Sequence, residues 1–292
     1  MNVKEGLSML NYKEIDFDEV WFETMGWNSF CQEGRKFFDE YEADFWKKLA
    51  PRYTTEYNLN NDTHKIAQKL AELLGENQNI LEIGCGTGNF TMLMAEYSKH
   101  ILGVDFSQDM LNELNKRVIS KKYQHIDLVQ SKWEDYLPES KFDYIVSVNS
   151  LYRIRYMKEA LVKMHETTTK GVVLVRTIQE PFLAKLYEDC NLQYNKCLDY
   201  ELIPIILWRM GILAQVEFIH YTRQKTYNSL AEIEQDILKD LSSTNKYHYD
   251  NDFIFRINKD KLQQKLQKYL KIIDDKYVIT MPRVTAFIYW KK

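Results

Sequence analysis

Short apolar runs alternate with amphipathic segments through the middle of the chain, between residues 78 and 178. Five apolar strands are expected there, at 80–83, 101–104, 126–129, 144–148 and 172–175. Helices are expected between the strands, for example over 90–97, and after Ser107, which has the side chain of an N-cap. Because the strands are almost continuously apolar, both of their faces should be buried. The pattern predicts an α/β fold with a doubly wound, mostly parallel sheet.

The two ends of the chain follow other patterns. Near the N-terminus apolar residues recur at helical steps, which predicts one buried helix face made of Phe30, Phe37, Tyr41, Phe45 and Leu49. Another helix is expected after the polar residues 60–63. Beyond residue 178 we expect a strand at 216–221, helices over 230–241 and 262–270, and a last strand at 284–290.

These patterns divide the chain into four parts. Residues 1–60 form a helical N-terminal cap, residues 61–227 form the α/β core, and residues 276–292 form the last strand of a seven-stranded sheet. Residues 228–275 stand between the final strands as a helical insertion. Ligands of open α/β sheets bind at the strand ends. We therefore expect 228–275 to act as a lid over such a site, together with the N-terminal cap.

Composition narrows the class of protein. The 292 residues are 45% hydrophobic, so a large packed core is available and wholesale disorder is excluded. The 39 Lys and Arg residues are balanced by 42 Asp and Glu residues, which argues against a protein whose main partner is a nucleic acid. Aromatic residues reach 14%. They predict either an aromatic-lined cavity or an aromatic core.

No pattern of metal ligands or membrane segments is found. The four cysteines fit no zinc spacing, and the six histidines form no metal-binding motif. No apolar run approaches the ~18 residues that a membrane-spanning helix needs, and the N-terminus does not resemble a secretory segment. We therefore expect a cytoplasmic protein with reduced thiols, without a bound metal and without a membrane partner.

A glycine-rich segment carries the strongest chemical signal. Glu82-Ile83-Gly84-Cys85-Gly86-Thr87-Gly88 follows a predicted strand and precedes a predicted helix. Backbone N–H groups at such a place can approach a ligand closely. Asp105 ends the next strand, where a carboxylate can accept hydrogen bonds from ribose hydroxyls. The dinucleotide fingerprint G-x-G-x-x-G would require glycine at position 89, and this chain has Asn89.

The observed E-x-G-x-G-x-G resembles motif I of the class I S-adenosylmethionine-dependent methyltransferases, and the resemblance extends from Trp46 to Thr177. It implies a Rossmann-like methyltransferase fold, S-adenosylmethionine as cofactor and a glycine loop that holds the methionine half. It further implies that Asp105 binds the ribose and that Phe106 packs on the adenine. The cofactor-binding residues that it implies are Tyr53, Glu82, Gly84, Cys85, Gly86, Gly88, Asp105, Phe106, Met110, Lys132, Trp133, Glu134 and Asn149.

Two positions depart from the family's pattern. Many members carry an acid near position 132 that accepts from the adenine amino group, whereas this chain has Lys132. Backbone groups of Lys132 and Trp133, or the carboxylate of Glu134, would then read the adenine. Many small-molecule members have a histidine near position 153, whereas this chain has Arg153. Arg153 either binds an anionic group of the acceptor or pairs with the following helix.

The segment from Trp46 to Tyr53 resembles the part that closes over the cofactor in small-molecule members. Tyr53 is the candidate donor to the cofactor's carboxylate, with Arg52 or Tyr57 as substitutes. Plain packing within the N-terminal cap is the other interpretation, because tyrosine is common at half-buried positions.

The leading hypothesis is methyl transfer from S-adenosylmethionine to a small-molecule acceptor by in-line displacement. No general base stands out; Tyr152 and Arg153 are weak catalytic candidates, with Trp27 and Tyr57 as further pocket walls. Two alternatives stay open: a methyltransferase acting on RNA or protein, and a non-catalytic cofactor-binding subunit. An oxidoreductase ranks third because of Asn89. The sequence leaves monomer and homodimer equally open.

Overall fold

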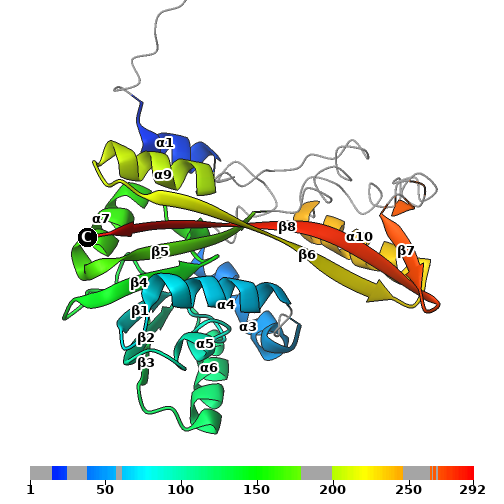
Figure 1. The fold of residues 1–292 in the computed structure, drawn as a ribbon, viewed down its shortest axis with the longest axis horizontal. Helices are drawn as coiled ribbons and strands as arrows, with labels where there is room; N and C mark the ends of the chain where they lie inside the picture. Colours follow the sequence, from blue (N-terminus) through cyan, green and yellow to red (C-terminus); the bar gives the residue numbers. More distant parts are fainter. Residues whose placement is uncertain are drawn as a thin grey trace, which may run out of the picture.

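The computed structural model describes residues 15–24, 38–56, 61–178, 199–245, 264, 266, 267 and 269–292. A mixed sheet runs through the molecule (Figure 1). Its parallel part consists of β1 (Asn79–Ile83), β2 (His100–Asp105), β3 (Ile126–Gln130), β4 (Phe142–Val148) and β5 (Thr168–Ile178). Each expected strand of the middle part is confirmed.

The strand order is β3-β2-β1-β4-β5-β8-β6. The crossover from β3 past β1 to β4 reverses the direction in which strands are added, and this reversal opens a crevice at the carboxyl ends of β1 and β4. β8 (Lys276–Lys291) runs antiparallel to β5, and β6 (Gln215–Tyr227) runs antiparallel to β8. The expected doubly wound, mostly parallel, Rossmann-like sheet is therefore present.

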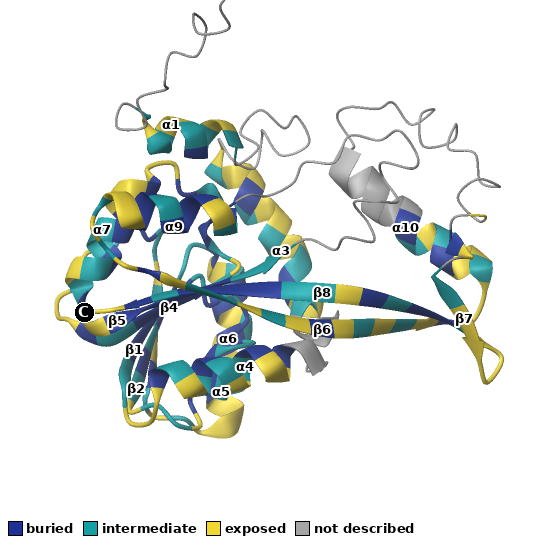
Figure 2. Ribbon diagram, turned by 45° about the horizontal axis from the view of Figure 1, so that its top comes forward, coloured by how far each residue is buried: buried dark blue, intermediate teal, exposed yellow. Residues whose placement is uncertain are grey.

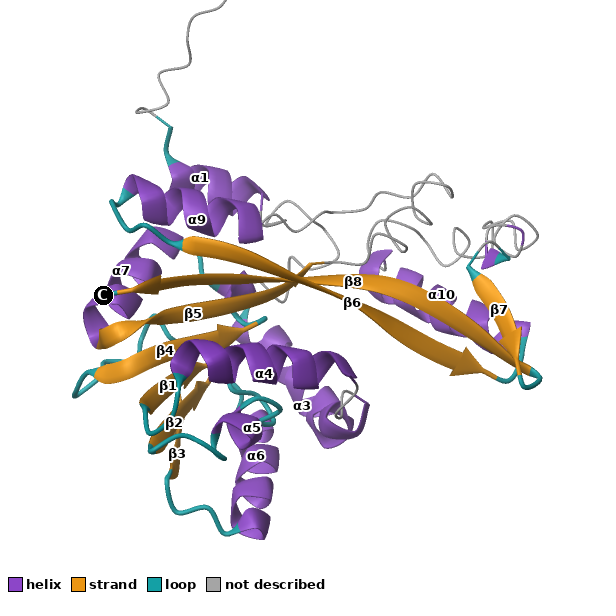
Figure 3. Ribbon diagram, viewed as in Figure 1, coloured by secondary structure: helices purple, strands orange, loops and turns teal. Residues whose placement is uncertain are grey.

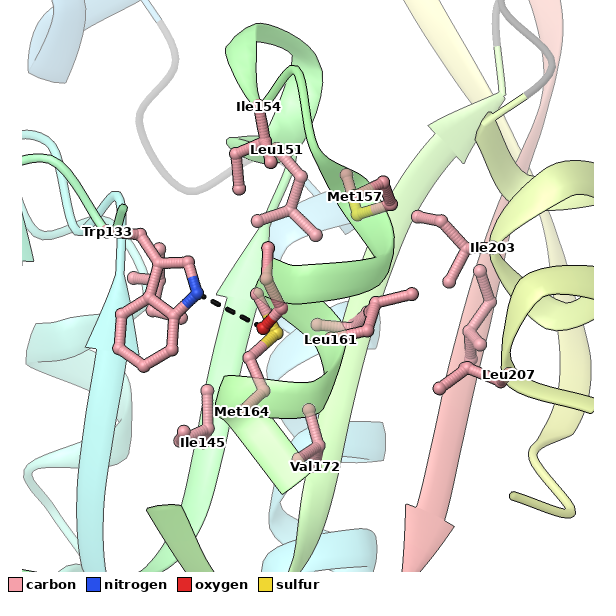
Figure 4. Packing of buried hydrophobic residues seen from close by; sticks show 14 of the residues in the cluster. Trp133, Ile145, Leu151, Ile154, Met157, Leu161, Met164, Val172, Ile203 and Leu207 are labelled. Carbon is pink, nitrogen blue, oxygen red and sulfur yellow. Dashed lines mark hydrogen bonds between the residues drawn. The ribbon is translucent and has the colours of Figure 1, made fainter. Parts of the chain in front are cut away.

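Helices cover both faces of the sheet (Figure 3). One face carries α1 (Phe17–Phe22), α7 (Met157–Thr167) and α9 (Asp199–Arg209), whose side chains form a core with Leu81, Ile145 and Val172. Figure 4 shows part of this core, with the α7 side chains between the sheet and α9. The other face carries α4 (Asn61–Leu74), α5 (Thr91–Met94) and α6 (Gln108–Lys121) over a second core. α5 is shorter than the helix expected over 90–97.

The N-terminal helix α3 (Asp39–Glu56) corrects the expected apolar stripe. Tyr41 and Phe45 point outward, with 56% and 36% of their surfaces exposed, whereas Glu42 is only 1% exposed. Phe30 and Phe37 lie outside the described residues, and Leu49 is half-buried. The inward face of α3 is partly polar because it covers a cavity rather than the apolar core.

A long antiparallel ribbon extends from the sheet (Figures 1 and 2). β6 and β8 stay paired over the whole length of β6, well beyond the strand expected at 216–221. α10 (Leu230–Asn245) packs on the distal half of this ribbon, where Ile233 and Ile237 are buried. The expected helix over 230–241 is therefore present, but it lies on the ribbon.

In the expected helix over 262–270, residues 264 and 266 are helical, residues 262, 263, 265 and 268 lie outside the described residues, and Leu270 is not helical. Leu270 begins a short strand, β7 (Leu270–Ile273), which pairs with β8. The two strands are joined by Asp274 and Asp275, both with positive φ (49° and 59°), as in a type I′ turn. An Asp-Asp pair between two apolar runs is the local signal for this hairpin.

Substitution of Asp275 tests the turn of this hairpin. At φ of 59° a residue with a Cβ is strained, so D275G should have a free energy of unfolding about 1 kcal/mol higher than D275A. In a helix the order would be reversed, because glycine is destabilising there by a similar amount. Urea unfolding of the two variants measures the sign, and D275A more stable than D275G would contradict the hairpin.

Candidate active site

A cavity of about 420 Å³ lies at the carboxyl ends of β1, β2 and β4. In the part of the chain that the structure describes, its walls come only from residues between 39 and 155. Residues of 228–275 that are described do not line it, and the role of this range as a lid stays a prediction. The cavity brings together fourteen of the fifteen residues that the sequence singled out: Tyr53, Glu82, Gly84, Cys85, Gly86, Asp105, Phe106, Met110, Lys132, Trp133, Glu134, Asn149, Tyr152 and Arg153.

The glycine loop after β1 forms the floor of the cavity. Gly84, Gly86 and Gly88 all have positive φ (70°, 56° and 82°), which other residues adopt at a cost. A Cβ on Gly84 would overlap the side chain of Ser150, so this glycine lets the turn after β4 approach the loop. Gly88 is the sequence candidate that does not line the cavity. A Cβ there would overlap Leu114 of α6, so this glycine serves packing.

Asp105 joins the glycine loop to the end of β2. Its carboxylate accepts hydrogen bonds from the backbone N–H of Gly86 and of Ser107, each at 2.8 Å. Burial raises the pKa of Asp105 in spite of these two bonds, and the negative charge of Glu42 adds to the effect. The carboxylate is held rigidly at the cavity wall, in position to accept from a ligand's hydroxyl groups.

Glu82 is a buried carboxyl group at the end of β1. Burial raises its pKa to about 8, and the charge of Asp105 acts in the same direction. The hydroxyl of Thr91 donates to Glu82 at 2.5 Å and offsets part of this rise. Glu82 is therefore mostly protonated at neutral pH.

Phe106 lies under a cluster of three charged side chains. The guanidinium of Arg153 is 5.4 Å from the centre of its ring, and the ammonium of Lys132 is 6.0 Å away. Both cations pair with the carboxylate of Asp39, the first residue of α3; Arg153 does so at 2.8 Å. Arg153 thus pairs with the N-terminal helix, and its expected role toward the acceptor or the following helix stays a prediction.

The side chain of Trp133 points away from the cavity. Its ring lies in the core against α7, where its indole N–H donates to the carbonyl of Ala160 at 3.3 Å (Figure 4). Glu134 follows at the cavity wall. The indole itself is occupied elsewhere, and the expected recognition of a ligand by backbone groups at 132 and 133 stays a prediction.

Asn149 and Tyr53 line opposite parts of the cavity. Asn149 has a positive φ of 55°, and its side-chain oxygen accepts from the backbone N–H of Thr177 at 2.8 Å, so the amide ties the ends of β4 and β5 together. Tyr53 lies on α3 with its ring 5.6 Å from that of Trp46, edge to face. Of its proposed substitutes, Tyr57 is outside the described residues and Arg52 does not line the cavity.

Sequence reasoning missed the residues that α3 contributes besides Tyr53. Asp39, Glu42 and Trp46 all line the cavity. Together with Tyr53 they recur at steps of three, four and seven, which is the spacing of one helix face. The helical spacing was present in the sequence. A search for apolar residues alone cannot find this helix face, because the face carries two carboxylates.

The cavity offers an unsatisfied polar group to a ligand. The hydroxyl of Thr87 lines the cavity, is buried and has no hydrogen-bond partner, so a bound polar group could satisfy it. A Cβ added at Gly86 would meet only a methionine carbon, at 3.4 Å, so there is space beside this residue, although its backbone N–H is already bonded to Asp105. No group of three potential metal ligands occurs among the described residues. Within the same residues, no helix has the length and apolar character needed to cross a membrane.

The raised pKa of Glu82 predicts a pH-dependent stability. The folded protein keeps the Glu82 proton up to about pH 8, whereas the unfolded chain loses it near pH 4.5. The free energy of unfolding therefore falls as pH rises between these values, by about 1.4 kcal/mol per unit of pKa shift. In E82Q the part of this decrease in unfolding free energy that comes from Glu82 should be absent. At pH 9 the variant should therefore be more stable than the wild type by a few kcal/mol.

Urea unfolding at pH 5, 7 and 9 measures the effect, with E76Q as control because Glu76 is exposed. Parallel stability curves for E82Q and the wild type would show that Glu82 is not a buried, protonated group.

Comparison with known proteins identifies the family. Residues 74–271 match the model of a family described as "Methyltransferase domain". An uncharacterized methyltransferase of Staphylococcus carnosus is 26% identical over 160 residues, which are 52% of this chain and 73% of the relative. A demethylmenaquinone methyltransferase of Listeria monocytogenes is 24% identical over 135 residues, 43% of this chain and 56% of the relative. The matched region thus spans little more than half of the Listeria protein.

Two solved structures share the fold. The YcgJ protein of Bacillus subtilis aligns with a TM-score of 0.50 at 12% identity, over 78% of this chain and 99% of that one. The magnesium protoporphyrin IX methyltransferase of Synechocystis aligns with a TM-score of 0.51 at 11% identity, over 84% and 99%. The family model covers well over half of this chain, and the sheet order and glycine loop agree with it. The chain belongs to the class I S-adenosylmethionine-dependent methyltransferases.

Proposed function

We propose that this methyltransferase acts on a small-molecule acceptor, which binds beside the cofactor in the cavity under α3. The main support for the proposal is that α3 covers the carboxyl ends of the strands. α3 lies over them and contributes Asp39, Glu42, Trp46 and Tyr53 to the walls. A cavity of about 420 Å³ with such a roof suits a small molecule better than a folded protein or an RNA strand.

Two further observations support a small acceptor. The Listeria relatives are named demethylmenaquinone methyltransferases, after a small molecule. The net charge of the chain is −3, and two of the three cations that line the cavity among the described residues are paired with Asp39, which makes the site less suited to a phosphate backbone.

The cofactor-binding roles are part of the same proposal. The backbone of Gly84 and Gly86 holds the methionine half, and the hydroxyl of Thr87 binds one of its polar groups. Asp105 accepts from the ribose hydroxyls, and Glu82 at the end of β1 accepts or donates according to its protonation. The adenine lies against Phe106 and Met110, with backbone groups at 132 and 133 at its edge. Tyr53 reaches the methionine carboxylate from α3.

When bound, S-adenosylmethionine supplies a methyl group on a good leaving group, so the protein has little covalent chemistry to perform. The residues of the cavity orient the acceptor in line with the methyl carbon and exclude water. The roof formed by α3 serves both purposes. We extend the proposal to residues 1–60 as a cap and to 228–275 as an insertion beside the site.

Cofactor binding is tested by thermal unfolding with S-adenosylhomocysteine. At about 100 times its dissociation constant the ligand should stabilise the fold by about 2.7 kcal/mol, a shift of several degrees for a chain of this size. D105A removes a charged acceptor and should lower the affinity tenfold or more. D135A, which removes an exposed carboxylate nearby, should leave the shift unchanged.

The acceptor class is tested with S-adenosylmethionine labelled in its methyl group. Transfer to members of a small-molecule panel, with none to total RNA or to a cell protein extract, is the expected result. Labelling of RNA or protein alone would contradict the small-acceptor proposal while leaving the cofactor assignment intact.

A further inference from the structure

Glu42 is a buried carboxylate that the cofactor assignment does not use. It lies on α3, is 1% exposed and lines the cavity. Its Oε1 accepts from the indole N–H of Trp46 at 2.6 Å and from the hydroxyl of Tyr152. The same indole N–H is 3.2 Å from the Tyr152 hydroxyl, so the three side chains form one cluster. A buried carboxylate is costly, and sites that keep one are commonly functional.

Tyr152 lines the cavity beside the glycine loop. It belongs to η3 (Leu151–Arg153), the turn after β4. The preceding Ser150 is in contact with Gly84, and its hydroxyl donates to the carbonyl of Ile83 at 2.8 Å. The Tyr152 turn is therefore fixed against the glycine loop, which holds the methionine half of the cofactor in the proposed function.

Glu42 faces the cavity from the opposite side. The helix α3 carries it over the strand ends, and its charge is close enough to Asp105 to raise the pKa of that group. Two of the cations at the cavity, Lys132 and Arg153, are joined to Asp39 one turn earlier on α3. Glu42 accepts from two neutral donors, the indole of Trp46 and the phenol of Tyr152, so its carboxylate is linked directly to the Tyr152 hydroxyl.

We propose that Tyr152 and Glu42 accept the proton of the methyl acceptor, whose nucleophile is therefore an O–H or N–H group. This inference rests on the proposed function. Tyr152 is the catalytic residue that touches the acceptor, and Glu42 acts through it as a positioning residue and final proton acceptor.

Methyl transfer and proton transfer then take place together. A lone pair on the acceptor's oxygen or nitrogen forms the bond to the methyl carbon, and the bond from carbon to sulfur breaks with its electrons staying on sulfur. The acceptor's proton passes to the Tyr152 oxygen while the Tyr152 proton passes to Glu42. The carboxylic acid later returns this proton to water, and no other reactant is needed.

Binding of two known ligands tests the position of Glu42. S-adenosylmethionine carries a positive sulfur and S-adenosylhomocysteine does not. A carboxylate beside the reacting methyl group favours the charged ligand, so E42Q should lower the affinity ratio of the two by about tenfold. Calorimetric titration gives both affinities. E42D, which keeps the charge, should restore most of the ratio.

Two variants serve as controls for this titration. E40Q removes a charge from the exposed side of the same helix and should leave the ratio unchanged. Y152F keeps the charge of Glu42 and should also leave the ratio near that of the wild type. An unchanged ratio in E42Q would overturn the proposal.

Methyl transfer tests the role of Tyr152. The labelled cofactor is offered to a panel of phenols, alcohols, amines, thiols and carboxylic acids. We expect transfer to O–H or N–H acceptors, lowered about 10²- to 10⁴-fold in Y152F and in E42Q, with E40Q like the wild type. Transfer to thiols or carboxylic acids alone, or full activity of Y152F, would overturn the proposal. Failure of the wild type to bind either ligand would instead contradict the proposed function on which the inference rests.

Discussion

The close approach of two turns at Gly84 determines the rest of the site. The turn after β1 and the turn after β4 touch there because the glycine has no side chain and Ser150 fills the space. The Ser150 hydroxyl bonds to the carbonyl of Ile83 and to the hydroxyl of Ser147, at 2.8 and 2.5 Å, which fixes the second turn against the first. This contact positions the side chains that η3 contributes to the cavity. The network is polar and partly buried, so its bonds are worth more than they would be in water.

The electrostatics of the cavity favour a cationic ligand. Five carboxyl groups and three cations line it: Asp39, Glu42, Glu82, Asp105, Glu134, Lys132, Arg153 and Arg155. Two of the cations are paired with Asp39. Burial keeps Glu82 protonated near neutral pH, which limits the repulsion among the remaining carboxylates. A sulfonium cofactor brings a positive charge into this group of carboxylates. Cofactor binding and ionisation of the carboxyl groups are therefore coupled.

The sequence predicted the central sheet and the floor of the site because both depend on local patterns. Apolar strands bounded by polar turns, and a glycine motif between a strand and a helix, can be recognised without knowledge of the partners. The roof could not be predicted in the same way. Tyr41 and Phe45 looked like the buried face of α3, but that helix covers a cavity, and its inward line includes Glu42. Likewise, Asp39 supplies the carboxylate that pairs with Lys132, a contact between residues 93 positions apart that no local pattern contains.

The position of β8 has a consequence for how the chain folds. β8 lies between β5 and β6, and it is the last strand in sequence order among the described residues. Among the described strands, β6 pairs only with β8, so during synthesis the sheet stays open along β5 until β8 has been made. Pairings of this kind join distant segments and are slow to form. Until then the edge of β5 is unpaired, and an unpaired strand edge in a partly folded chain favours aggregation.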